Sequence, residues 1–371
     1  MKVEEVKVKE GMKGLWKEVF HDSEEYVKIV FDNYFNVCKS FYREVDGKVA
    51  AMLMAVPYDF ASSTGRLLKG LYLCGVATTP MHRRRGLMGG LLEEANVWAR
   101  KQGFDFTFLI PSSAANRLYY SARGYHDSFF KKEEYYVKDH KFVGAGNLTP
   151  EEFKSVDRKE LVEYLEAIER VMSQEENVYT LLHSSNDWLA VIEESELSGG
   201  KIVLVRDTES KLSGVAFIAE EVTEDSDLVT VKRMFGKEEA QRSLLKYIKE
   251  KYSEKGLKVV RDLFETGDNE GQLWQPFYAQ SNSSRAEYED IAEVEVPVTG
   301  VEGSYSMGMI RIVDMETFLN KTGLKGSDEL QGFTDEELQS VMLRPAVHRP
   351  DELQKLLGLP ELSFSISLLL E

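Results

Sequence analysis

The chain has 371 residues, too many for one ordinary domain and enough for two or three that each bury a core. Hydrophobic residues make up 43% and charged residues 29%, a globular composition, and no apolar run is long enough to cross a bilayer. The net charge of −17 disfavours nucleic acid or an anionic membrane as a partner and favours cationic ligands. Because the N-terminus is acidic where a signal peptide would be basic, we expect a cytoplasmic protein.

The first predicted elements are a helix and a hairpin. Asp22 begins a capping box, and apolar residues follow it at helical spacing. Two strand-like runs, residues 41–45 and 48–56, are separated by an Asp-Gly pair, which is a strong signal for a hairpin turn.

A parallel strand–helix–strand unit is predicted next. A strand at residues 68–79 leads into a helix at 86–102, for which Gly103 is a typical stop. A buried strand at 104–110 and a short helix at 112–123 follow. This order predicts a right-handed crossover between parallel strands, with a ligand at their carboxyl ends.

Two further units follow a linker at residues 144–150, which mixes Gly, Asn and Pro without periodicity. The second unit loosely repeats the strand and helix order of the first. The third opens with strands near residues 291–298 and 306–314, and continues with helices near Met315, Thr334 and Asp351. We therefore expect an α+β (mixed α/β) fold with domains at residues 1–145, 150–290 and 291–371.

The two cysteines, Cys38 and Cys74, lie among apolar or aromatic neighbours. Neither has the Cys or His spacing that a metal site or a redox pair requires. We expect buried free thiols and no metal.

The most informative run reads VATTPMHRRRGLM and extends from Val76 to Met88. A strand feeds a turn that opens a helix, whose first backbone N–H groups are unpaired and attract phosphate. Gly86 lets the backbone approach the anion, and three arginines before it can add charge-assisted contacts to a pyrophosphate. The alternative, an exposed basic helix start, is disfavoured because an acidic chain concentrates three arginines here.

This segment resembles the acetyl-CoA signature of GNAT N-acetyltransferases: Arg or Gln, two residues, Gly, one residue, then Gly or Ala. Arg83 and Gly86 match it, whereas Met88 departs from the small final residue. Main-chain donors hold the phosphate, so the departure leaves the mechanism in place. The resemblance implies acetyl-CoA as cosubstrate, bound by Val76, Ala77 and Thr78 at the pantetheine arm and by Arg83, Arg84, Arg85, Gly86, Leu87, Met88 and Gly89 at the phosphates.

A second motif, residues 118–125, is similar to the family's pattern of aromatic-Tyr, three residues and Gly-aromatic. Tyr120 matches the tyrosine that protonates the departing CoA thiolate, a task for a positioned general acid. The alternative is core packing, since the chain has 17 tyrosines. Phe31 and Phe35 are candidates for the acceptor pocket, again with core packing as the alternative.

The remainder resembles the Eis (enhanced intracellular survival) branch of GNAT proteins. That branch joins an active GNAT domain, a degenerate GNAT-like domain and a C-terminal sterol-carrier-protein-like (SCP2-like) domain. Three short matches carry the resemblance: Asn186-Asp187-Trp188, residues 214–218 and residues 309–314.

The resemblance assigns different roles to the second unit and to the C-terminus. Residues 233–236 superficially repeat the phosphate motif, but Glu238 and Glu239 follow in the first helical turn and would repel a pyrophosphate. We therefore expect no CoA in the second unit. In Eis-type enzymes the C-terminal carboxylate is the general base, which would be Glu371 here; the alternative is a frayed acidic end.

The predicted function is direct transfer of an acetyl group from acetyl-CoA to the primary amine of a small molecule or peptide. The alternative is a noncatalytic acyl-CoA-binding or regulatory protein with the same fold. The sequence does not identify the amine, and it leaves a homo-oligomer open.

Overall fold

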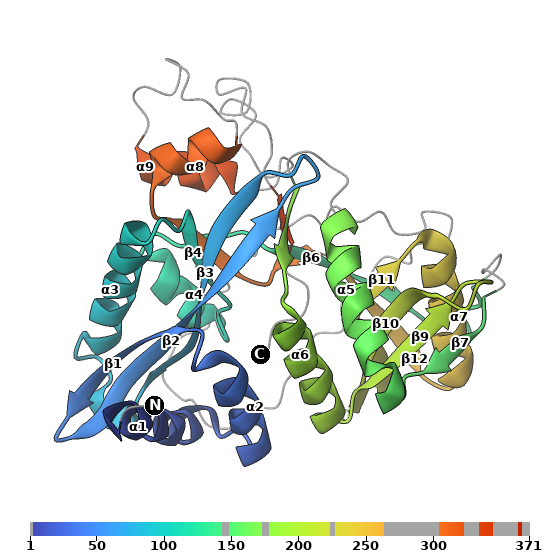
Figure 1. The fold of residues 1–371 in the computed structure, drawn as a ribbon, viewed down its shortest axis with the longest axis horizontal. Helices are drawn as coiled ribbons and strands as arrows, with labels where there is room; N and C mark the ends of the chain where they lie inside the picture. The colour runs from blue at the N-terminus through green and yellow to red at the C-terminus, as the bar shows by residue number, and fades with distance from the viewer. Residues whose placement is uncertain are drawn as a thin grey trace.

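The structure, a computed structural model, describes residues 3–142, 148–172, 178–222, 227–262, 304–322, 334–343 and 363–365. Two sheets with helices on their faces lie side by side in it (Figure 1). The predicted mixed α/β class is therefore confirmed. Within these ranges no helix combines the length and the apolar character that a membrane span requires.

The first sheet has the order β15-β8-β2-β3-β4-β14-β5, and β1 pairs with β2 beside it. Strands β3 and β4 are parallel, with residues 70–72 opposite 106–108, and helix α3 connects them as the sequence predicts. The strands are β1 (Lys39–Val45), β2 (Lys48–Ala61), β3 (Leu67–Thr78), β4 (Phe106–Leu109), β5 (His126–Asp127), β8 (Val178–Leu182), β14 (Met309–Ile312) and β15 (Ser363–Ser365).

Helices cover both faces of this sheet. Residues 52, 54 and 56 of β2 pack in one core cluster with α1 (Val3–Phe20) and α2 (Glu24–Tyr34), whereas residues 53 and 55 pack in another with α3 (Leu87–Lys101) and α4 (Ala114–Ser121). Alternate residues of a strand point to opposite faces, so α1 and α2 lie on one face and α3 and α4 on the other.

The start of α2 differs slightly from the prediction. Its N-cap is Ser23, whose hydroxyl accepts a hydrogen bond from the backbone N–H of Tyr26. Asp22, the predicted cap, instead accepts from the indole N–H of Trp16 at 2.7 Å. The carboxylate thereby ties α2 to α1, a helix that the sequence did not predict.

The second sheet has the order β13-β6-β12-β11-β10-β9-β7. It repeats a feature of the first, because β11 and β12 are parallel, with residues 228–231 opposite 256–259, and are connected by helix α7. Its elements are β6 (Phe130–Tyr136), β7 (Pro150–Glu152), β9 (Lys201–Arg206), β10 (Leu212–Val222), β11 (Asp227–Gly236), β12 (Gly256–Asp262), β13 (Ser304–Ser306), α5 (Arg158–Met172), α6 (Ser185–Leu197) and α7 (Glu238–Lys251).

Strands cross the predicted domain boundaries. Strand β6, from the first predicted domain, pairs with β12 of the second sheet, while β8 from the second pairs with β2 of the first. Strand β14, from the third, lies between β4 and β5. Local patterns predict where a strand is but not which strand it pairs with, so the division at residues 145, 150 and 290 remains a prediction and does not follow the sheet edges.

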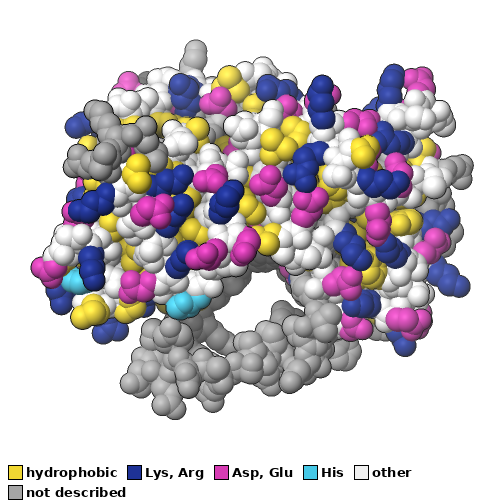
Figure 2. All heavy atoms as spheres, turned by 60° about the horizontal axis from the view of Figure 1, so that its bottom comes forward, with side chains coloured by type: hydrophobic (Ala, Val, Ile, Leu, Met, Phe, Trp, Pro, Cys, Tyr) yellow, Lys and Arg dark blue, Asp and Glu magenta, His cyan; other side chains and the backbone are white. Residues whose placement is uncertain are grey.

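Two helices follow β14: α8 (Met315–Thr322) and α9 (Asp335–Met342), which begins after Thr334 as predicted. The predicted strand at residues 291–298 lies outside the described residues. Acidic and basic side chains are interspersed over the described part of the face in Figure 2, without a continuous patch of one sign.

Candidate active site

A bulge interrupts β3 near its carboxyl end. In the pairing with β2, Ala77 lies opposite Met52 and Cys74 opposite Met54, so Gly75 and Val76 share one position. Gly75 has φ +59°, and a Cβ there would lie 2.5 Å from Cζ3 of Trp16. Only glycine fits both the left-handed backbone and the space.

Strand β3 also separates from β4 here. The last parallel pair is Tyr72 with Phe108, yet β3 continues to Thr78. Val76, Ala77 and Thr78 therefore lie beyond the pairing with β4, on a strand edge that can bind an extended, amide-bearing chain. This position suits the predicted pantetheine contact.

The turn after β3 opens α3 with free donors. Gly86 is the N-cap, with φ +79° and no side-chain cap, so the N–H groups of the first turn, Leu87, Met88 and Gly89, have no capping side chain. The side chains of Arg83, Arg84 and Arg85 are exposed, and no ion pair joins them to a carboxylate in the described ranges. Helix N–H donors and arginine side chains of this kind can bind a polyanion.

Arg123, to which the sequence analysis gave no role, lies beside this helix start. A Cβ on Gly89 would lie 3.6 Å from Nη2 of Arg123. The guanidinium stacks on Tyr119 at 3.6 Å and donates to the Tyr119 carbonyl at 2.7 Å. The signal available in the sequence was its place in the same motif as Tyr120, two residues after the end of α4.

Tyr120 is buried, on the α3 face of the sheet. Its side chain is 7% exposed and belongs to the cluster that includes Leu71 and Leu73 of β3. Burial, and then the neighbouring Tyr125, raise the pKa of its phenol well above the usual value. Tyr120 is therefore protonated at neutral pH, as a general acid must be, and it also packs in the core.

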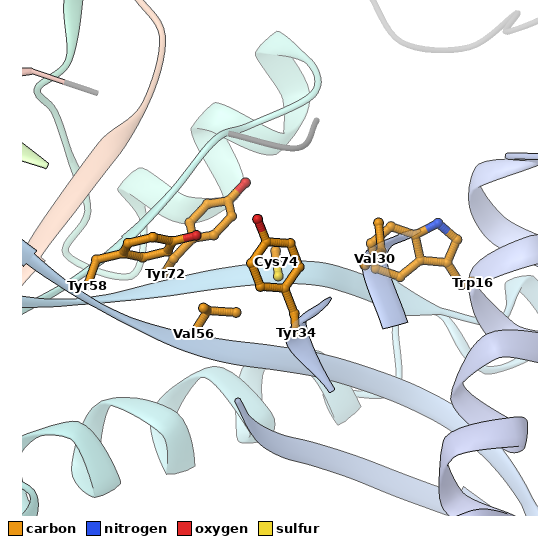
Figure 3. A pocket seen from close by; sticks show the side chains of 7 residues that line it. All are labelled: Trp16, Val30, Tyr34, Val56, Tyr58, Tyr72 and Cys74. Carbon is orange, nitrogen blue, oxygen red and sulfur yellow. The ribbon is translucent and has the colours of Figure 1, made fainter. Parts of the chain in front are cut away.

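A pocket lies on the opposite face of the same strands (Figure 3). Its interior volume is about 10 Å³, about the space of one water molecule. In Figure 3, Tyr58 and Tyr72 lie toward one end, Trp16 and Val30 toward the other, and Tyr34 and Cys74 between them. Its lining side chains are Trp16, Val30, Tyr34, Val56, Tyr58, Tyr72 and Cys74.

The predicted acceptor residues do not line this pocket. Phe31 is 0% and Phe35 7% exposed, and both belong to the core cluster of α1 and α2. Phe31 packs edge-on against Trp16, with ring centroids 5.8 Å apart. Val30 and Tyr34, on the adjoining face of the same helix, line the pocket instead. The helical spacing of apolar residues in the sequence does not tell the core-facing side of α2 from the side that lines the pocket.

Both cysteines are free. Cys74 faces the pocket, and burial raises the pKa of its thiol well above the usual value. It is therefore a neutral part of the wall at physiological pH.

In the second sheet, buried ion pairs lie near the point where the parallel strands β11 and β12 stop pairing. Pairing of β11 with β12 ends at Val231 and Val259, and Arg233 and Asp262 lie just beyond it. Asp262 binds Arg233 at 2.9 Å and Lys131 of β6, all with side chains at most 4% exposed. These buried ion pairs lie just beyond the paired part of the two strands. That this unit binds no CoA stays a prediction.

The predicted general base, the carboxylate of Glu371, lies outside the described residues, as do most of residues 291–371, for which an SCP2-like domain was predicted. Within the described ranges, no three His, Cys, Asp or Glu side chains are arranged to hold a metal ion.

Residues 5–127 match the acetyltransferase (GNAT) domain family. A conserved protein of Enterococcus faecalis V583, named a probable N-acyltransferase, superposes with TM-score 0.62 at 16% identity, over 86% of this chain and 73% of that one. A GCN5-related N-acetyltransferase from Anabaena variabilis ATCC 29413 superposes with TM-score 0.58 at 15% identity, over 85% of this chain and 72% of that one. Eis1 from Mycobacterium abscessus superposes with TM-score 0.56 at 13% identity, over 83% of this chain and 72% of that one. No curated protein matches the sequence. Residues 5–127 are therefore similar to GNAT acetyltransferase domains, and the chain shares the fold of these solved structures.

Proposed function

We propose that the protein transfers an acetyl group directly from acetyl-CoA to a primary amine. The observation that carries this proposal is the end of β3. Its edge beyond the pairing with β4 and the basic helix start would form a cofactor site beside α3, and the pocket lies on the face covered by α1 and α2. The two substrates would thus meet across one bulged strand.

The cofactor residues divide into two groups. The backbone of Val76, Ala77 and Thr78 would bind the pantetheine amides as an added strand does. The first turn of α3, with Arg83 to Arg85, would bind the phosphates through N–H donors and guanidinium groups. Arg123 adds a cation beside Gly89.

The bulge and Tyr120 would perform the chemistry. The amine nitrogen attacks the thioester carbon, and backbone N–H groups around Gly75 stabilise the oxyanion that forms. As the carbon–sulfur bond breaks, Tyr120 donates its proton to the sulfur, so CoA leaves as the thiol. The proton lost by the amine passes to a base, for which the Glu371 carboxylate remains the predicted acceptor.

A thiol-release assay with acetyl-CoA and a panel of primary amines tests this function. Tyr120→Phe keeps the ring and removes the donor, so we expect kcat to fall about 100-fold or more, with the Kd for acetyl-CoA unchanged. Tyr119→Phe is the matched control, because its ring neighbours Tyr120 at 5.5 Å, and it should retain kcat. Wild-type protein that binds acetyl-CoA but releases no thiol with any amine would instead be the noncatalytic alternative.

A further inference from the structure

One two-stranded ribbon carries the chain between the two sheets. β5 and β6 are consecutive strands in different sheets, and so are β13 and β14; β5 pairs with β14 in the first sheet, and β6 with β13 in the second. Between the sheets the two segments stay hydrogen-bonded, because the N–H of Ser128 donates to the Gly308 carbonyl at 3.0 Å and that of Met307 to the Phe129 carbonyl at 2.8 Å. The antiparallel pairing is therefore unbroken from one sheet to the other.

This ribbon packs closely against the end of β4. A Cβ on Gly308 would lie 2.9 Å from the carbonyl oxygen of Leu109, the last residue of β4, and 2.8 Å from Cδ2 of Phe129. The Ser306 hydroxyl donates to the Gly308 carbonyl at 2.8 Å and holds the same turn of backbone. Since β3 and β4 are parallel, their carboxyl ends meet at one edge of the sheet. The ribbon therefore crosses at the edge where acetyl-CoA is proposed to bind.

Arg117 of α4 binds both segments of the ribbon. Its Nη1 forms an ion pair with Oδ1 of Asp127, and its Nη2 donates to the Ser306 carbonyl at 2.7 Å. Asp127 is the last residue of β5 and Ser306 the last of β13, so the two contacts lie on different segments. The Arg117 side chain is 23% exposed. A planar guanidinium that donates to two acceptors fixes the orientation of its helix as well as its position.

The helix that Arg117 holds also carries the proposed general acid. α4 has eight residues, too few to be stable without tertiary contacts, and Tyr120 lies one turn after Arg117. The Tyr120 ring packs against Tyr119 and Tyr125, with centroids 5.5 and 6.0 Å away. Among the described residues its hydroxyl has no hydrogen-bond partner that would fix its direction. The direction of the phenol therefore depends on how α4 is held.

We propose that Arg117 is a positioning residue for the acid step, which directs the Tyr120 phenol toward the acetyl-CoA sulfur by clamping α4 to both segments of the ribbon. The proposal rests on the proposed function and adds a residue to it. Arg117 transfers no proton: the proton passes from the Tyr120 oxygen to sulfur as the carbon–sulfur bond breaks. Because Ser306 lies 189 positions after Arg117, the acid of the first unit depends on a strand from the far part of the chain.

The first test replaces the guanidinium. Arg117→Met keeps a long aliphatic side chain and removes both donors, so we expect kcat in the thiol-release assay to fall about 10-fold or more, with the Kd for acetyl-CoA unchanged. Arg117→Lys, which keeps the charge, should restore part of kcat. Arg158→Met is the matched control, because Arg158 is 29% exposed and pairs with Glu196 at 2.7 Å in the second unit; it should retain kcat. A wild-type kcat in Arg117→Met would overturn the proposal.

A double-mutant cycle separates positioning from a general loss of structure. If Arg117 acts through the phenol, Arg117→Met should change kcat less than about 2-fold when Tyr120→Phe has already removed the acid. A merely structural role would instead lower kcat by the same factor in both backgrounds, and that result would refute the inference. Full kcat in Tyr120→Phe alone would refute the acid step of the proposed function.

Hydrogen exchange measured by mass spectrometry tests the clamp without turnover. In Arg117→Met the backbone amides of residues 114–125 should exchange at least about 10-fold faster than in wild type, while those of α3 should be unchanged. Unchanged exchange in residues 114–125 would refute the clamp even if the protein releases thiol. Faster exchange there, in a protein whose wild type releases no thiol with any amine, would refute only the proposed function.

Discussion

Gly75→Ala is the substitution to which the site should be most sensitive. The residue sits in the β3 bulge with φ +59°, where an L-residue is strained, and the new Cβ would lie 2.5 Å from Cζ3 and 3.0 Å from Cε3 of Trp16. Trp16 cannot move freely, because its indole N–H donates to Asp22 and its ring packs against Phe31. The methyl group must therefore shift either the bulge or the pocket wall.

The expected cost has two parts. A left-handed backbone at a residue other than glycine costs about 1–2 kcal/mol, and overpacking a filled site adds about 1–3 kcal/mol. Gly47→Ala is the matched control, because Gly47 has φ +73° in the first hairpin with no atom within 4 Å of an added Cβ. It should carry the backbone part alone.

Urea denaturation and thiol release measure the two consequences. Gly75→Ala should lose about 2–5 kcal/mol of unfolding free energy and most of its turnover, and Gly47→Ala about 1–2 kcal/mol with turnover retained. Equal losses of stability in the two variants, or full activity in Gly75→Ala, would refute the role given to the bulge.

Three further predictions concern stability. Asp262→Ala removes the carboxylate between two buried cations and should cost about 3–5 kcal/mol in urea denaturation, so a loss below about 1 kcal/mol would contradict the buried ion cluster. Burial raises the pKa of Tyr34 and Tyr58 above the ordinary 10.0, so their contribution to stability is complete below pH 10 and lost above it. The urea midpoint should therefore decline as the pH rises from about 9 to 11, and replacing both tyrosines by Phe should flatten that decline. Ile310→Ala, fully buried in β14, should cost about 2–5 kcal/mol, against less than about 0.5 for exposed Val97→Ala; equal costs would mean that β14 does not complete the first core.

Local elements of the fold could be predicted from the sequence. The strand, turn and helix around the phosphate motif match β3 and α3 within one residue at each end. The Asp46-Gly47 turn has φ +50° and +73°, the left-handed values that such a hairpin needs. These features depend on residues close together in the chain, so their signals survive without a structure.

Long-range features could not be predicted. Asp187 contacts Tyr58 across 129 positions, and β14 pairs with β4 from the far end of the chain. Sequence periodicity reports which face of an element is apolar, but not which segment covers it. That limit also applies to Phe31 and Phe35, which were predicted to line an acceptor pocket: both lie in the core cluster of α1 and α2, and Val30 and Tyr34 of the same helix line the pocket beside it.

The most direct test of the central claim follows both products of one reaction. Wild-type protein is incubated with acetyl-CoA and each amine of the panel, and thiol release is compared with the N-acetylated amine detected by mass spectrometry. Direct transfer at the end of β3 predicts one acetylated amine per thiol released, with both rates falling together in Tyr120→Phe. Thiol release without acetylated amine, or equal rates in wild type and Tyr120→Phe, would contradict it.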